Sequence, residues 1–264
     1  MALPFPVPSH LAPAFSMSRC TTADVDAIAK IYYEAFETDP RNGFWWSPDK
    51  AAMYAWMKRR ILRKMADRST RHFKVTDAQS GKLVAFARWD IPEGYGAVFG
   101  EPTEADPEPV DVSQTVAAGE GAEGVPQGGE NAPVTTAPVD VITPPKTDIP
   151  DGAPPDLCQI FFDALSNMSE KQNAKTMLGL SLLCTSPAYF GKGAAKALMF
   201  PMLNLADAHG LKTYLEATPG GKPVYEKLGF KEVDELVFDL KKLTGKFEDV
   251  YKLSIMVREP NSIS

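Results

Sequence analysis

The predicted order of helices and strands indicates a mixed α/β protein in which helices flank one sheet. Apolar residues at helical spacing predict helices in the first part of the chain, from residue 22, and two strands of a predicted hairpin follow them. Later, Leu178–Thr185 (LGLSLLCT) is a nearly continuous apolar run, as in a strand that is buried on both faces. Because helices and strands alternate from there to the end, we expect a mixed sheet.

The first half of the chain supplies two helices and the hairpin. Val25, Ile28 and Ile31 are three residues apart behind a Thr-x-Ala-Asp start that can cap a helix. Asp39-Pro40 and Gly43 end this helix, since proline and glycine interrupt helices. The predicted elements are helices at residues 22–36 and 49–66 and strands at residues 72–76 and 82–89.

The second half continues the alternation, and Pro187 ends the buried strand. The predicted elements are helices at residues 157–168, 193–208 and 221–228 and strands at residues 178–185, 212–217, 231–240 and 250–257.

An acidic segment at residues 93–156 separates the two halves. It is built of Pro, Gly, Ala, Val, Thr and carboxylates, with aromatic residues only at Tyr95 and Phe99. Its 13 carboxylates and single cation, Lys146, give a net charge of −12 against −6 for the whole chain, so the remainder carries +6. Such a segment buries too little apolar area to offset its ordering entropy, and we expect it to be disordered.

The domain organisation follows from this division. We expect a flexible leader at residues 1–17, the N-terminal half of one domain at 18–92, the disordered insertion at 93–156, and the C-terminal half at 157–264.

The composition argues against several classes of protein. The apolar runs are shorter than the roughly 20 residues that span a bilayer. Three scattered cysteines and three distant histidines indicate neither a disulfide framework nor a metal site, and we expect reduced thiols in the cytoplasm, with the nucleus an alternative. The cations at residues 58–64 have the spacing of a solvated helix face, so we expect no nucleic-acid partner.

The most informative stretch follows the buried strand, where residues 190–195 (FGKGAA) lead into a helix. Gly191 and Gly193 allow close approach of the backbone, and free N–H groups at a helix N-terminus bind pyrophosphate. Lys192 and Lys196 add positive charge. The loop matches neither a P-loop nor a Rossmann turn, and a purely structural tight turn is the alternative.

Two motifs together resemble the GNAT superfamily of N-acetyltransferases. Its acyl-CoA motif, [QR]-x-x-G-x-[GA], is matched at Gly193 and Ala195, with Phe190 in place of Gln or Arg. Residues 223–230 (PVYEKLGF) match its aromatic helix and Leu-Gly-Phe turn, and residues 215–219 (LEATP) resemble a fungal-type subgroup. The resemblance implies the GNAT fold, with a central mixed, mostly antiparallel sheet, and acetyl-CoA as co-substrate without a metal.

The resemblance also implies roles for individual residues. The acyl-CoA contacts would come from the end of the strand and the loop after it, namely Leu183, Cys184, Thr185, Phe190, Gly191, Lys192, Gly193, Ala194, Ala195 and Lys196. Tyr225 stands where the family places the acid that protonates the leaving thiolate. Glu216, at the end of the next strand, is our candidate base, with a structural carboxylate as the alternative.

The acceptor would be a primary amine of a small molecule or peptide, next to a specificity wall of Phe44, Trp45 and Trp46, for which core packing is the alternative. Two other functions stay open: an acyl-CoA-binding sensor or scaffold without turnover, and a protein whose working part is the acidic insertion. We expect no membrane partner and leave a homodimer open.

Overall fold

Seven strands form one sheet in the order β1-β2-β3-β4-β5-β7-β6 in the computed structural model, which describes residues 3–7, 14–102, 148–246 and 248–261. Every neighbouring pair of strands is antiparallel except β4 and β5, which are parallel. The strands are β1 (Phe15–Arg19), β2 (Thr70–Asp77), β3 (Leu83–Asp90), β4 (Leu178–Thr185), β5 (Thr213–Ala217), β6 (Lys231–Asp239) and β7 (Val250–Arg258).

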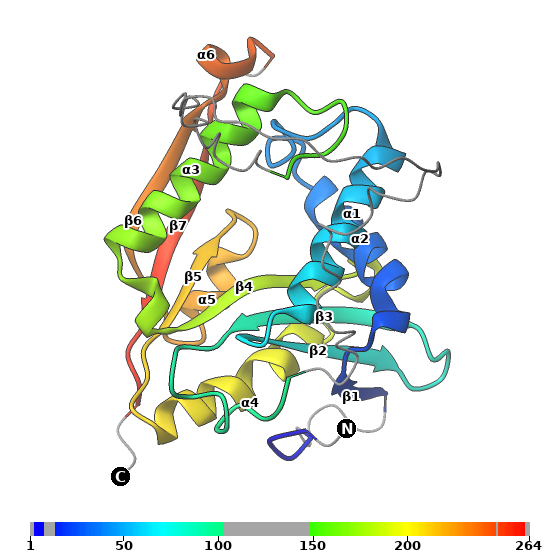
Figure 1. The fold of residues 1–264 in the computed structure, drawn as a ribbon, viewed down its shortest axis with the longest axis vertical. Coiled ribbons are helices and arrows are strands. Elements are labelled where there is room, and N and C mark those ends of the chain that lie inside the picture. The colour runs from blue at the N-terminus through cyan, green and yellow to red at the C-terminus, as the bar shows by residue number, and fades with distance from the viewer. Residues whose placement is uncertain (1–2, 8–13, 103–147, 247, 262–264) are drawn as a thin grey trace, which may run out of the picture. The chain divides into compact units, whose positions relative to one another are not determined.

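Helices cover both faces of this sheet (Figure 1). They are α1 (Val25–Glu37), α2 (Lys50–Ala66), α3 (Pro155–Lys171), α4 (Ala194–Ala208), α5 (Lys222–Glu226) and α6 (Leu240–Thr244), with short 3-10 turns η2 (Thr22–Asp24), η3 (Ala174–Thr176) and η4 (Pro187–Tyr189). Helix α1 contacts β3 and β4 from one face, α4 contacts β2, β3 and β4 from the other, and α3 contacts β6. No helix within the described ranges is long and apolar enough to cross a membrane.

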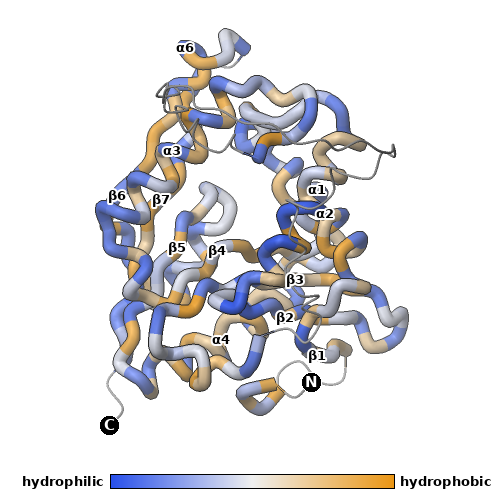
Figure 2. The backbone as a smooth tube through the Cα atoms, viewed as in Figure 1, coloured by the Kyte–Doolittle hydropathy of each residue, from blue (hydrophilic) through white to orange (hydrophobic). Residues whose placement is uncertain are grey.

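Two hydrophobic cores lie on the opposite faces of the sheet. Helix α4, which is mostly hydrophobic along its length (Figure 2), packs with the inner residues of β2 and β3 in the first core. Helices α1, α2 and α3 pack with β4, β6 and β7 in the second core, around the fully buried Trp56. The strands β3 and β4 contribute to both cores, which explains why apolar residues occupy successive positions in each of them.

Local signals fix the ends of the elements. The Asp49 carboxylate accepts a hydrogen bond from the N–H of Ala51 at 2.8 Å and caps α2, and Arg63 and Lys64 lie in its last turn, where positive charge is favourable. Asp77 accepts backbone bonds from Gln79 and Ser80 in the hairpin turn.

The structure corrects the predicted leader at residues 1–17. Phe15 and Met17 belong to β1, which pairs with β2 along its full length. Phe5 is buried, and its ring centroid lies 5.2 Å from that of Phe73. The described part of the leader is therefore attached to the core by apolar contacts, and residues 1–2 and 8–13 lie outside the described residues.

The predicted insertion is also too long at both ends. Phe99 is fully buried, and Tyr95 and Val98 pack against the core on the α4 side. At the other end Ala153 is buried, and α3 begins at Pro155. Aromatic and apolar side chains thus hold residues 93–100 and 153–156 to the domain, while residues 103–147 lie outside the described residues.

Candidate active site

An opening between β4 and β5 is the centre of the candidate site. The two parallel strands pair only from Leu178 to Leu180 on β4, although β4 continues to Thr185 and β5 to Ala217. Beyond Leu180 the strands diverge, and the edge of β4 that faces β5 has no strand partner among the described residues. Backbone N–H and C=O groups must find partners, so this edge offers hydrogen bonds to an extended ligand.

The strand leads from this opening into the glycine loop. Gly191 and Gly193 have φ of 74° and 89°, in the left-handed region that favours glycine, and Gly193 caps α4. A Cβ at either glycine would meet no atom within 4 Å, so the loop borders open space. The first N–H groups of α4 have no acceptor within the helix and carry its positive dipole end, which suits a phosphate.

Side chains around the loop agree with an anion site. Ala194 is buried, and Ala195 is half-buried, so small residues stand at the helix start. Lys192 and Lys196 are exposed, and the Lys192 ammonium lies 4.6 Å from the ring centroid of Tyr189. Phe190, which replaces the family's Gln or Arg, is 52% exposed, so the position supplies no polar support to the loop.

Tyr225 lies on α5 and is buried, with its ring centroid 5.9 Å from that of Phe230. The Leu-Gly-Phe turn holds this helix, because the N–H of Phe230 donates to the carbonyl of Tyr225 at 3.1 Å. Burial, and then the nearby Cys184, raises the pKa of Tyr225, so its hydroxyl keeps its proton at neutral pH and can donate it.

The β4 residues predicted to contact the acyl group alternate in exposure. Cys184 is buried, whereas Leu183 and Thr185 are half-buried. Burial raises the pKa of the Cys184 thiol, which argues against a thiolate nucleophile. Tyr225 packs in the core on the α4 side, and Leu183 packs against the same core, whereas Cys184 lies in the other core. The structure thus brings the end of β4 and the candidate acid to one face of the sheet through Leu183.

Glu216 lies on β5 just beyond the last β4–β5 pair. Burial raises its pKa, and the charge of Asp90 raises it further, whereas Tyr214 and Arg88 lower it. A carboxylate with a raised pKa can accept a proton from an ammonium more readily than an ordinary glutamate can. The structure thus places the candidate base at the edge of the opening.

The three predicted wall aromatics lie in the second core. Phe44 and Trp45 are buried, and Trp46 is half-buried. The Trp45 ring stacks on Phe161 with centroids 5.0 Å apart, and Phe44 lies 5.2 Å from Phe238. Phe44 and Trp45 therefore hold α3 against the sheet, which is the core packing given as the alternative, and contact with an acceptor stays a prediction.

Other residues of the same loop border an open groove. One cavity of about 690 Å³ is lined by Thr38, Asp39, Pro40, Arg41, Pro219, Gly220 and Asp249. A neighbouring cavity of about 450 Å³ shares Arg41 and Pro219 with it and extends along β7. Arg41 joins the α1–α2 loop to the residue before β7, with its Nε 2.9 Å from Asp39 Oδ1 and its Nη1 3.1 Å from Asp249 Oδ2. Sequence reasoning missed this groove because Asp249 is 208 residues from Arg41.

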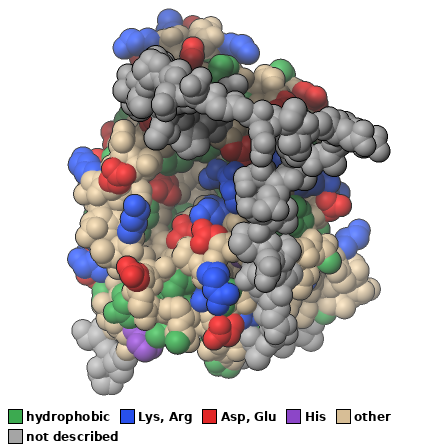
Figure 3. All heavy atoms as spheres, in the orientation of Figure 1, with side chains coloured by type: hydrophobic (Ala, Val, Ile, Leu, Met, Phe, Trp, Pro, Cys, Tyr) green, Lys and Arg blue, Asp and Glu red, His purple; other side chains and the backbone are tan. Residues whose placement is uncertain are grey.

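Charged groups of both signs gather over the middle of the face seen in Figure 3. Within the described ranges, no set of three or more His, Cys, Asp or Glu side chains could hold a metal ion. The charged and hydroxyl side chains of the candidate site can transfer protons and donate or accept hydrogen bonds.

Comparison with solved structures identifies this arrangement of strands and helices. A histone acetyltransferase HPA2 and related acetyltransferase from Corynebacterium glutamicum is similar over 95% of this chain and 99% of its own, at 18% identity and a TM-score of 0.50. The chain has the GNAT fold. Arylalkylamine N-acetyltransferase 2 from Aedes aegypti is similar over 94% and 99%, at 14% identity and a TM-score of 0.53.

Residues 166–239 match the family model of the acetyltransferase (GNAT) domain. This segment runs from within α3 to the end of β6 and includes the opening, the glycine loop and Tyr225. No curated protein sequence matches the chain. The family match and the GNAT fold support an acyltransferase enzyme.

Proposed function

We propose that this protein transfers the acetyl group of acetyl-CoA to a primary amine by direct attack. The observation that carries the proposal is the free edge of β4 from Ser181 to Thr185, which the chain continues through η4 and the glycine loop to the N-terminus of α4. A ligand with an extended amide chain at one end and a pyrophosphate at the other fits such a path. The amides can bond the strand edge, and the phosphates can bond the glycine loop.

The acyl transfer needs stabilisation of an oxyanion. The amine nitrogen attacks the thioester carbonyl carbon, a C–N bond forms, and the carbonyl oxygen becomes negative. Backbone N–H groups at Leu183 and Thr185 are the candidate donors, because they turn to the edge of β4 that borders the opening. The predicted donor Cys184 does not share this orientation: the N–H of Ser186 donates to the Val84 carbonyl of β3, and by strand alternation the N–H of Cys184 turns to β3 as well. Collapse of the intermediate then breaks the C–S bond and releases CoA thiolate.

Two side chains account for the protons. Tyr225 donates its hydroxyl proton to the departing thiolate, and its raised pKa keeps that proton in place until the thiolate forms. The attacking nitrogen is positively charged once the C–N bond has formed, and the proton that it loses as the amide forms returns to the Tyr225 phenolate, directly or through water. Glu216 removes a proton from the acceptor ammonium, directly or through water, because only the neutral amine is a nucleophile. The acceptor amine would reach Glu216 through the groove beside Arg41 and Asp249, on the side of the α1–α2 loop.

A turnover assay tests the proposal. The wild-type protein is mixed with acetyl-CoA and a panel of monoamines, polyamines and peptides with free amino termini, and thiol release is followed with a chromogenic disulfide. We expect amine-dependent thiol release, and mass spectrometry should find an acceptor that has gained one acetyl group.

A binding-only protein would behave differently. It would bind acetyl-CoA with no amine-dependent thiol release and no acetylated product, and that outcome would favour the sensor or scaffold. Tyr225→Phe is the matched variant, since it removes only the hydroxyl and keeps the ring that packs on Phe230.

A further inference from the structure

Strand β4 contains one residue more than its partner β3 at Ser181. Leu180 and Leu182 stand opposite consecutive residues of β3, and Ser181 between them has no counterpart in the register. Such a bulge shifts the alternation of side chains, so Leu180 packs in the core on the α4 side and Leu182 in the core on the α1 side. Because pairing with β5 also ends at Leu180, the bulge marks the point where the candidate site begins.

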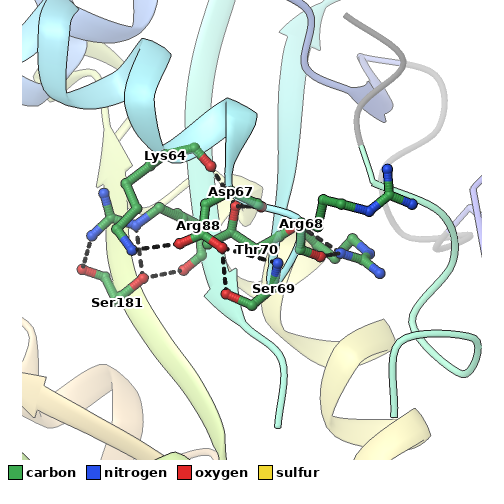
Figure 4. A network of polar contacts seen from close by, with 8 residues as sticks. Lys64, Asp67, Arg68, Ser69, Thr70, Arg88 and Ser181 are labelled. Atoms are coloured by element: carbon green, nitrogen blue, oxygen red, sulfur yellow. Dashed lines mark hydrogen bonds and ion pairs between the residues drawn. The ribbon is translucent and has the colours of Figure 1, made fainter. Parts of the chain in front are cut away.

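Arg88 holds this bulge from β3 (Figure 4). Its Nε donates to Ser181 Oγ at 2.8 Å and its Nη2 to the Ser181 carbonyl at 3.4 Å, while Ser181 Oγ donates to the Arg88 carbonyl at 3.3 Å. Arg88 is only 6% exposed. One planar guanidinium therefore fixes both the side chain and the backbone of the bulged residue, which a lysine ammonium could not do with the same geometry.

A buried cation is costly unless nearby groups compensate it. The charge of Arg88 acts on titratable groups from four elements: His72 on β2, Cys184 on β4, Glu216 on β5 and Tyr32 on α1. Other charged or titratable groups act on the same four side chains, namely Arg19 on β1, Asp90 on β3, Tyr214 on β5, and Arg60, Lys64 and Asp67 on or just after α2. Burial, and then Arg88, lowers the pKa of His72 to about 3, so that imidazole is neutral.

Glu216 is the group in this set that the proposed reaction uses. Its neighbours oppose one another, because Asp90 disfavours its charged form and Arg88 favours it. The Asp67 carboxylate is already bonded to Lys64, at 2.8 Å, and to Ser69, with Ser69 Oγ 2.6 Å away. Ala87 and Trp89 on β3 pack in the core on the α4 side, as do Leu215 and Ala217 on β5. Because side chains alternate along a strand, Arg88 and Glu216 both point to the opposite face of the sheet.

We propose that Arg88 is a positioning residue for acyl transfer, which fixes the free edge of β4 through Ser181 and presents its charge to Glu216. This inference rests on the proposed acetyltransferase function. It explains why a guanidinium is buried beside a serine at the point where the two central strands separate.

The test compares Arg88→Met, Arg88→Lys and Ser181→Ala with the wild type. Lys241→Met is the control, because Lys241 is an exposed cation on α6 that forms an ion pair with Glu248. For each folded protein, kcat and KM are measured from pH 5 to 9. The carboxyl pKa of Glu216 is measured by NMR on protein labelled with 13C at glutamate, with Glu216→Gln for assignment.

In Arg88→Met we expect kcat to fall about ten- to a hundredfold, because the strand edge shifts. We expect the acidic limb of the profile and the NMR pKa of Glu216 both to move to higher pH, because the favourable cation is gone. Arg88→Lys should keep the limb near its wild-type position and lose turnover, since it retains the charge without the planar fork. Ser181→Ala should lower kcat without moving the limb.

Wild-type kcat and an unshifted Glu216 pKa in Arg88→Met would overturn the inference. If Arg88→Met does not fold, wild-type turnover in both Arg88→Lys and Ser181→Ala would overturn it instead. A wild-type protein with no turnover at all would refute the proposed function, and the NMR titration would then still report whether Arg88 acts on Glu216.

Discussion

Gly193→Ala tests the glycine loop, and Gly210→Ala provides a matched control at the other end of the same helix. Both glycines have positive φ, 89° and 64°, and a Cβ at either would meet no atom within 4 Å. Each substitution therefore costs backbone strain of about 1–2 kcal/mol without a clash. The two sites are about 22 Å apart, the length of the 15-residue helix α4.

The two variants should differ in ligand binding. A methyl group at position 193 intrudes where phosphate oxygens would approach the first N–H groups of α4, and each charge-assisted hydrogen bond lost there is worth about 1.5–3 kcal/mol. The Kd for acetyl-CoA should therefore rise about ten- to a hundredfold in Gly193→Ala and stay unchanged in Gly210→Ala.

Calorimetric titration and urea unfolding of both variants measure the two quantities separately. Equal losses of stability together with equal Kd values would refute the reasoning, because strain alone would then account for Gly193. A weaker Kd in Gly210→Ala would refute it as well, since that glycine lies far from the loop.

Three further predictions concern the catalytic pair and the fold. Tyr225→Phe should lower kcat about a hundredfold at unchanged acetyl-CoA affinity, and unchanged kcat in steady-state assays would exclude Tyr225 as the acid. Burial raises the pKa of Glu216, so the acidic limb of the wild-type pH profile of kcat/KM should lie above the usual range for a glutamate. Glu216→Gln should abolish this limb, and a limb that persists in the variant would belong to another group. Asp207→Asn should lower the free energy of unfolding in urea melts by about 3 kcal/mol, because the Asp207 carboxylate holds the buried Arg258 with two contacts of 2.7 Å. Glu248→Gln removes an exposed ion pair and should lower the same free energy by about 0.5 kcal/mol or less. Equal losses in the two variants would contradict this prediction.

Much of the fold follows from local pattern. The apolar run at Leu178–Thr185 is β4 with the predicted bounds, and the helix predicted at residues 193–208 is α4 to within one residue. Strong periodicity and punctuation by Pro187 and Gly193 determine these ends. The glycine loop and the helix that carries Tyr225 can also be predicted from the sequence, because the residues of each motif are contiguous.

Features that depend on contacts between residues far apart in the sequence could not be predicted from it. The β1 strand has five residues and is defined by its pairing with β2, more than fifty positions later in the sequence. Its own sequence carries no comparable signal, and the first part of it was therefore assigned to a flexible leader. The run LGLSLLCT does not reveal that the bulge at Ser181 changes the face of the following leucines, because β3 and β5 impose it. The contact of Phe44 and Trp45 with Phe161 of α3 also joins residues far apart in the sequence, and the predicted contact of these aromatics with an acceptor stays a prediction.

The central claim is that the opening between β4 and β5 and the glycine loop bind acetyl-CoA. Isothermal titration of the wild type with acetyl-CoA, alongside the double variant Gly191→Glu, Gly193→Glu, tests it most directly, with circular dichroism and melting to confirm that the variant folds. The account predicts saturable binding by the wild type, with a Kd of about 1 μM to 1 mM, and its loss in the folded variant. No heat and no thermal shift with any acyl-CoA, or equal binding by both proteins, would contradict it.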